Sequence, residues 1–237
     1  MSLLALIGAG LAAAASFVSS AVSVIGGAVA STAVSIMTKL PVVVEKALPV
    51  VRAIGTIINA VSPFVGIQAP DNENMEEIGA KAMQDGTRPR RPDETAQEYL
   101  DYLRNEVELN EEKYEKLTND QKLGCATVGI ALRAEEMSDF TGVQISPEFL
   151  VMAQKSKMQY EQISKMIEVF KNNGETTLDD VPKYLDNTLD ESKVERVGGL
   201  VKETIKENDP HLEDREIYEE IIEMKRNYNN PDEYIPS

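Results

Sequence analysis

The 237-residue sequence has no Trp, only one Cys and one His, and no charged residue before Lys39. A single cysteine, Cys125, cannot form an intrachain disulfide, and the apolar run around it predicts a buried core residue. The single histidine, His211, lies in a polar stretch at an expected helix start, which predicts a solvated side chain. Neither a catalytic triad nor a histidine-rich metal site can be assembled from this inventory. We therefore expect no enzymatic activity, catalytic residue, cofactor or metal ion.

A dinucleotide-binding turn is the one cofactor motif that the sequence approaches. Gly8, Gly10 and Ala13 match its glycine pattern. The acidic residue expected about 20 positions later is missing, and no alternation of strands and helices follows. We interpret these small residues as helix-packing positions.

The charge is divided unevenly along the chain. The formal net charge is −16, from 24 basic and 40 acidic residues, yet residues 1–70 carry only Lys39, Glu45, Lys46 and Arg52. Residues 1–70 therefore carry a net charge of +2, and the whole acidic excess lies after Pro70. A body with this charge repels phosphate groups, so we expect no nucleic-acid partner.

The uncharged N-terminus exceeds the length of about 20 residues that spans a bilayer. It has no basic segment at its start, and its apolar character does not end after one short run, so we expect no cleaved signal peptide. Small residues recur at helical spacing and would let helix backbones approach closely. The predicted helix-packing residues are Ser16, Ser19, Ser23 and Gly27.

Bulky apolar residues in the same region recur in steps of three and four, which indicates one face of a helix. We predict this face to meet a membrane or a protein partner. Its residues are Val18, Val22, Ile25, Val29, Ile36, Leu40, Ile54, Ile57, Ile58 and Val61.

The whole pattern predicts an all-α protein, because no period-two run is long enough for a sheet. We expect a hydrophobic helical hairpin or linked helices over residues 1–68, a linker over 69–92, an acidic multi-helix soluble domain over 93–228, and a polar tail over 229–237. Pro41, Pro49 and Pro63 are expected to divide the first region.

Helix boundaries are predicted from capping signals. Asp93 is expected to cap a helix to about residue 107, and Thr118 with Gln121 fits a capping box for a helix to about 137. Ser146 before Pro147 predicts a helix from 146 to about 172. Further helices are expected over 75–83, 177–185, 191–207 and 212–228.

The one basic cluster consists of Arg88, Arg90 and Arg91, within the expected linker. These arginines could contact anionic lipid headgroups or pair with the acidic domain. A third interpretation is that they are simply solvated.

Three hypotheses for function follow. In the first, residues 1–66 insert into a membrane or form a pore, the chain is a homo-oligomer through its small-residue helices, and the acidic domain docks a protein partner. In the second, the chain is a structural or cargo subunit of a phage-tail-like or secretion assembly, and its N-terminal helices plug or line a tube without entering lipid. In the third, the chain is an enzyme whose motif the sequence does not reveal. A plainer interpretation of the apolar third is that it is the core of a larger helical domain. In layout alone, the chain resembles phage ejection proteins, cargo of contractile injection systems and type III translocators.

Overall fold

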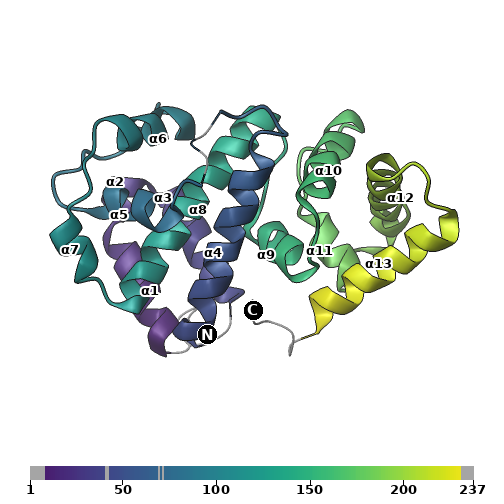
Figure 1. Ribbon diagram of the computed structural model, residues 1–237, viewed down its shortest axis with the longest axis horizontal. Coiled ribbons are helices and arrows are strands. Elements are labelled where there is room, and N and C mark those ends of the chain that lie inside the picture. The colour runs from purple at the N-terminus through teal and green to yellow at the C-terminus, as the bar shows by residue number, and fades with distance from the viewer. Residues whose placement is uncertain (1–8, 41–42, 69, 71, 231–237) are drawn as a thin grey trace. The chain divides into compact units, whose positions relative to one another are not determined.

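The computed structural model describes residues 9–40, 43–68, 70 and 72–230. Within these residues it contains thirteen α-helices and no strand (Figure 1). One isolated parallel bridge pairs Gln144 with Thr177. The prediction of an all-α protein is confirmed.

The chain forms two compact units. Among the described residues, unit 1 comprises residues 9–40, 43–59, 70 and 72–136, and unit 2 comprises 60–68 and 137–230. The segment expected to be a linker therefore belongs to unit 1 together with the uncharged helices. The polar tail expected over 229–237 lies outside the described residues from 231 onward.

Unit 1 is built from helices that follow one another closely. They are α1 (Ala9–Ser20), α2 (Val22–Ile25), α3 (Gly27–Thr38), α4 (Val44–Val61), α5 (Met75–Met83), α6 (Ala96–Asn105), α7 (Glu111–Glu115) and α8 (Asn119–Thr141). The last residues of α4 and α8 belong to unit 2. Unit 2 adds α9 (Pro147–Lys155), α10 (Tyr160–Asn172), α11 (Asp180–Leu185), α12 (Glu191–Asn208) and α13 (Asp214–Asn229).

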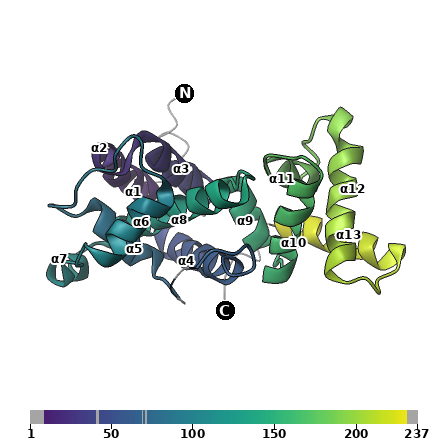
Figure 2. The same cartoon turned by 90° about the horizontal axis from the view of Figure 1, so that it is seen from above.

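Helix α8 is the central element of unit 1. Every residue from 123 to 134 is buried, so this stretch is covered on all sides (Figure 2). Helix α5 crosses it backbone to backbone, because glycines stand on both sides of the contact. A Cβ atom added at Gly79 would lie 1.8 Å from the Cys125 carbonyl oxygen, and one added at Gly129 would lie 2.0 Å from the Met75 carbonyl oxygen. Helix α1 packs on α8 at Gly124, where a Cβ would lie 3.0 Å from the Phe17 ring.

The bulky stripe of the uncharged region points into the fold of the chain itself. Of its ten predicted residues, all but Val22 are buried. This arrangement agrees with the plainer interpretation, in which the apolar third supplies part of a core. Among the described residues, none of the helices combines the length and the hydropathy needed to cross a lipid bilayer.

Val22 departs from the other stripe residues because the helix is not continuous. Helix α1 ends at Ser20, α2 is a single turn, and Gly26 has a φ of +86°. The breaks at Ala21 and Gly26 rotate α2 relative to α1 and α3, so its side chains do not continue their faces. Val22 is 40% exposed as a result.

Several capping predictions are confirmed, and others are wrong. Thr118 and Gln121 form the expected capping box, and the Ser146 hydroxyl caps α9 by accepting from the Phe149 amide. The cap of α6 is Thr95, whose hydroxyl accepts from the Glu98 amide while the Glu98 carboxylate accepts from Thr95, so the assignment to Asp93 is wrong by two residues.

Two predictions of where helices are interrupted are wrong. Pro49 lies inside α4 instead of separating two helices. The helix expected over 146–172 is two helices, because the chain turns at Lys157, whose φ is +56°. The Met158 amide then donates to the Ala153 carbonyl, which closes the end of α9 and buries the Met158 side chain.

Candidate functional site

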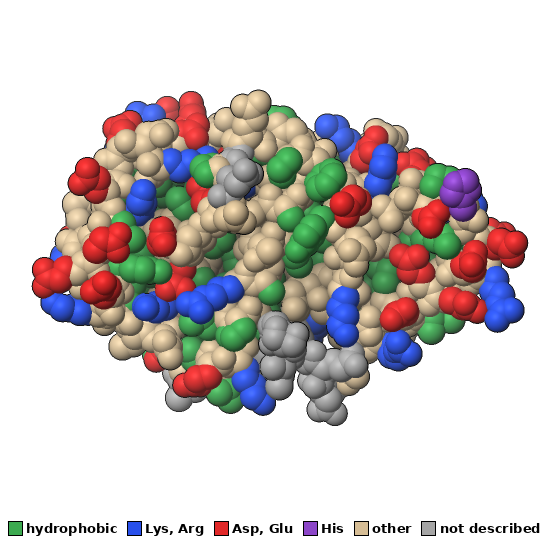
Figure 3. All heavy atoms as spheres, viewed as in Figure 1, with side chains coloured by type: hydrophobic (Ala, Val, Ile, Leu, Met, Phe, Trp, Pro, Cys, Tyr) green, Lys and Arg blue, Asp and Glu red, His purple; other side chains and the backbone are tan. Residues whose placement is uncertain are grey.

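The outer face of α1–α3 is uncharged and carries a shallow groove. The groove has a volume of about 450 Å³. It is lined by Ser19, Val22, Gly27, Ala30, Ser31, Val34, Ser35 and Thr38. This face contrasts with other surfaces of the molecule, since acidic side chains are spread over both units in the view of Figure 3.

The structure places all four predicted helix-packing residues on the surface. Ser16, Ser19, Ser23 and Gly27 are exposed, and Ser19 and Gly27 line the groove. They are therefore available for contacts with another molecule, whereas the close helix contacts inside unit 1 are made at Gly79 and Gly129. That contact was missed from the sequence, although Gly124 and Gly129 in an apolar helix are a signal for it.

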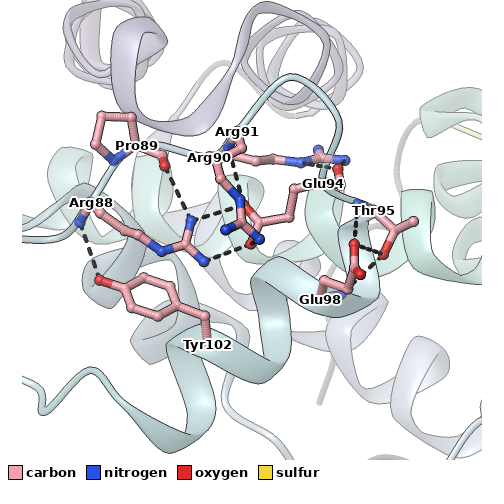
Figure 4. A network of polar contacts seen from close by, with 8 residues as sticks. All are labelled: Arg88, Pro89, Arg90, Arg91, Glu94, Thr95, Glu98 and Tyr102. Atoms are coloured by element: carbon pink, nitrogen blue, oxygen red, sulfur yellow. Dashed lines mark hydrogen bonds and ion pairs between the residues drawn. The ribbon is translucent and has the colours of Figure 1, made fainter.

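A second site lies where the three predicted arginines meet α6, as Figure 4 shows. The Arg88 guanidinium donates to both oxygens of the Glu94 carboxylate, at 2.6 and 2.9 Å. It also lies 4.0 Å from the centre of the Tyr102 ring, and the Tyr102 hydroxyl accepts from the Arg88 amide. The Glu94 side chain is only 1% exposed, and hydrogen bonding to Arg88 holds the pKa of Glu94 below its usual range.

Arg90 connects three parts of unit 1. Its guanidinium donates to both oxygens of Glu135 on α8, each at 2.8 Å, and to the Glu94 carbonyl. Its backbone amide donates to the Val24 carbonyl of α2 at 2.8 Å. Arg90 therefore links the 86–94 segment to α8 and to the uncharged helices.

Arg91 is the most solvated of the three arginines. Its side chain is 63% exposed and lies 3.5 Å from the Glu94 carboxylate, while its amide donates to the same carboxylate at 3.0 Å. All three arginines thus contact acidic groups of unit 1.

A buried cluster of charges next to α8 is absent from the sequence-based analysis. The Arg133 side chain is fully buried and pairs with Glu136, one turn along the helix, and with Glu73. Arg104 on α6 donates to both Glu73 oxygens, at 2.6 and 3.0 Å, and lies 3.6 Å from Glu136. Burial raises the pKa of Glu136, against the opposing effect of the two arginines. The spacing of Arg133 and Glu136 within an apolar helix is the signal that could have revealed this pair.

Glu76 extends the charged region at the start of α5. Its carboxylate accepts from Arg52 at 2.8 Å and from the Tyr114 hydroxyl at 2.9 Å. Among the residues with described positions, no group of three or more His, Cys, Asp or Glu side chains could hold a metal ion. The charged cluster consists of ion pairs between protein groups.

The remaining candidate residues have the environments that were predicted. Cys125 is buried, and burial raises the pKa of its thiol to about 12. His211 is exposed, and its amide donates to Asp209.

Comparison of the chain with protein-family models, with curated proteins and with solved structures finds no match. Over the residues that the structure describes, the chain is an all-α protein with an uncharged groove on α1–α3 and a segment of arginines paired with carboxylates.

Proposed function

We propose that the protein is a non-enzymatic assembly subunit that binds a second copy of itself through the outer face of α1–α3. The observation that carries this proposal is the exposure of an uncharged, small-residue face on a chain of net charge −16. Two acidic molecules repel one another at long range, so they approach most favourably through a face without charge. Small side chains on that face let helices of the two copies approach closely.

Within this proposal, the finer organisation follows the second hypothesis. The N-terminal helices belong to a larger assembly, of the phage-tail-like or secretion kind, and the acidic helices of residues 93–228 dock another protein. Ser16, Ser19, Ser23 and Gly27 are the contact residues between copies.

Placing one charge in the groove tests the proposal. Ser31 is exposed and lines the groove, so Ser31→Glu adds a carboxylate without disturbing the core. Gln97→Glu adds the same charge at an exposed position of α6 in the same unit and serves as the matched control. Sedimentation velocity over a range of concentrations should show wild type and Gln97→Glu associating alike, and Ser31→Glu at least about tenfold more weakly. A wild-type protein that remains monomeric, or two variants that behave alike, would contradict the proposal.

Membrane insertion is the second candidate, and one observation favours it. Helices α1 and α3 carry apolar residues on their buried faces and no charge on their exposed faces. A helix without a charged face loses little by transfer into lipid. Dye release from liposomes by the full chain, abolished by Ser31→Glu but not by Gln97→Glu, would favour this candidate, and absence of dye release would leave the assembly subunit.

A further inference from the structure

The helix break at Gly26 creates a backbone acceptor that needs a partner from elsewhere. The last carbonyls of a helix accept no hydrogen bond from an amide of the same helix. Gly26 ends α2 with a φ of +86°, which turns the chain into α3 instead of continuing the ladder. The Val24 carbonyl accepts from the Arg90 amide at 2.8 Å, so a segment more than sixty residues later completes the break.

Helix α2 has little stability of its own. It contains four residues, and an isolated single turn does not pay back the cost of its own nucleation in water. Ile25 is the one buried residue of α2 and provides its apolar contact with the rest of the unit. Its attachment to unit 1 therefore depends on that contact and on the hydrogen bond from Arg90.

The 86–94 segment is itself held by two bidentate ion pairs. Arg90 is fixed to Glu135 of α8, and Arg88 is fixed to Glu94, which lies just before α6. One partner of each pair reaches water, since Arg88 is 35% and Glu135 31% exposed. These anchors can therefore open without unfolding of the unit, unlike the fully enclosed Arg133 pair.

The segment also begins at a point where the backbone can pivot. Gly86 has a φ of +90°, and its surroundings are open, with no atom within 4 Å of where a Cβ would lie. The hydrogen bond from Thr87 to the Lys81 carbonyl is the first fixed point after it.

We propose that residues 86–94 are a latch that holds α2 on unit 1. When the Arg90–Glu135 pair opens, the Arg90 amide leaves the Val24 carbonyl and α2 loosens, while α8 stays folded and α3 stays anchored by its buried residues Val29, Ala33 and Ile36. The latch would thereby control the position of Val22, which lines the groove on α1–α3. This inference goes beyond the proposed function, because it concerns the attachment of α2 whatever partner covers the outer face of α1–α3.

Hydrogen exchange of the full chain, read by mass spectrometry, tests the latch. Arg90→Ala keeps the backbone amide but removes the guanidinium contacts with the Glu135 carboxylate and the Glu94 carbonyl. Exchange in α2 should then be at least about tenfold faster than in wild type, while exchange in α8 changes less than about twofold. Arg91→Ala is the matched control, because Arg91 lies beside Arg90 but is mostly solvated, and it should exchange like wild type.

A charge-reversal pair separates the latch from a general loss of stability. Glu135→Arg alone should open the latch as Arg90→Ala does, and the double variant Arg90→Glu with Glu135→Arg should restore slow exchange in α2. Equal acceleration in α2 and α8, or no acceleration in either, would overturn the latch. Failure of the double variant to restore protection would also overturn it. Repeating the exchange comparison in the Ser31→Glu background, in which the copies associate weakly, separates the latch from self-association, which sedimentation measures independently.

Discussion

A single methyl group at Gly129 should weaken unit 1 severely. The added Cβ would lie 2.0 Å from the Met75 carbonyl oxygen, whereas an ordinary contact begins at 3.4 Å. The atom in the way belongs to the backbone at the start of α5, so it cannot turn aside as a flexible side chain would. The two helices must move apart by more than 1 Å, which loosens the packing around Gly79 as well. We expect Gly129→Ala to lower the free energy of unfolding of unit 1 by about 3 kcal/mol, at the upper end of overpacking costs.

The matched control is Gly199→Ala, at an exposed position inside α12 with no atom within 4 Å of the new Cβ. Alanine is the better helix former there, so α12 should gain about 0.5–1 kcal/mol. Native-state hydrogen exchange measures the local stability of each unit through the exchange rates of its own amides. In Gly129→Ala, the slowest amides of α8 should exchange roughly 100-fold faster, since 1.4 kcal/mol corresponds to a factor of ten. Unchanged protection of α8, or a loss in Gly199→Ala of similar size, would refute the argument from helix contact.

Further predictions concern ionisable groups of unit 1. Because the pKa of Glu94 is lowered in the folded chain, its contribution is present above the ordinary carboxyl pKa of 4.5 and is lost as the pH falls through the lowered value. Urea unfolding should therefore show stability falling in acid, and Glu94→Gln should flatten that dependence; parallel curves would contradict the role of Glu94. The Cys125 thiol, with its pKa raised to about 12, should resist a maleimide at pH 8 until the protein is unfolded, and prompt labelling of native protein would show that it is not enclosed. Arg133→Met should cost about 3–5 kcal/mol by leaving buried carboxylates short of a partner, and the added change Glu136→Leu should recover part of the loss. Urea denaturation of the three chains measures this, and strict additivity of the two changes would disprove the coupling.

The helical class and several helix starts could be predicted because they depend on local chemistry. Thr118 and Ser146 act as caps through atoms within three residues, so their signals are complete in the sequence. The end of α9 could not be found in this way. Lys157 adopts a left-handed φ where glycine is the usual signal, and the turn is favoured by burial of Met158 against the rest of unit 2.

The fate of the apolar third could not be predicted, because it depends on a partner far along the chain. A run of 38 uncharged residues fits a bilayer, an assembly or a core equally well, and the environment decides. Here α1 packs on α8, whose Gly124 meets α1 across more than a hundred residues of sequence. The glycines of α8 signal close helix contact, but they do not say which helix makes it.

The candidate site was partly predictable for the same reason. The arginine cluster is visible as a cluster, and Glu94 lies close enough in sequence to be considered as a partner. Glu135 and the Val24 carbonyl are 45 and 66 residues from Arg90, so their roles require the fold.

The central position of α8 also has a consequence for biosynthesis. The ribosome delivers α1–α3 first and α8, on which α1 packs, about eighty residues later. At about 5–20 residues per second, the apolar face of α1 waits for several seconds without α8. During this interval the nascent chain exposes an apolar surface that α8 later covers. Synthesis of this protein should therefore depend on chaperones that bind nascent chains, and it should be most sensitive to translational pausing between residues 40 and 120.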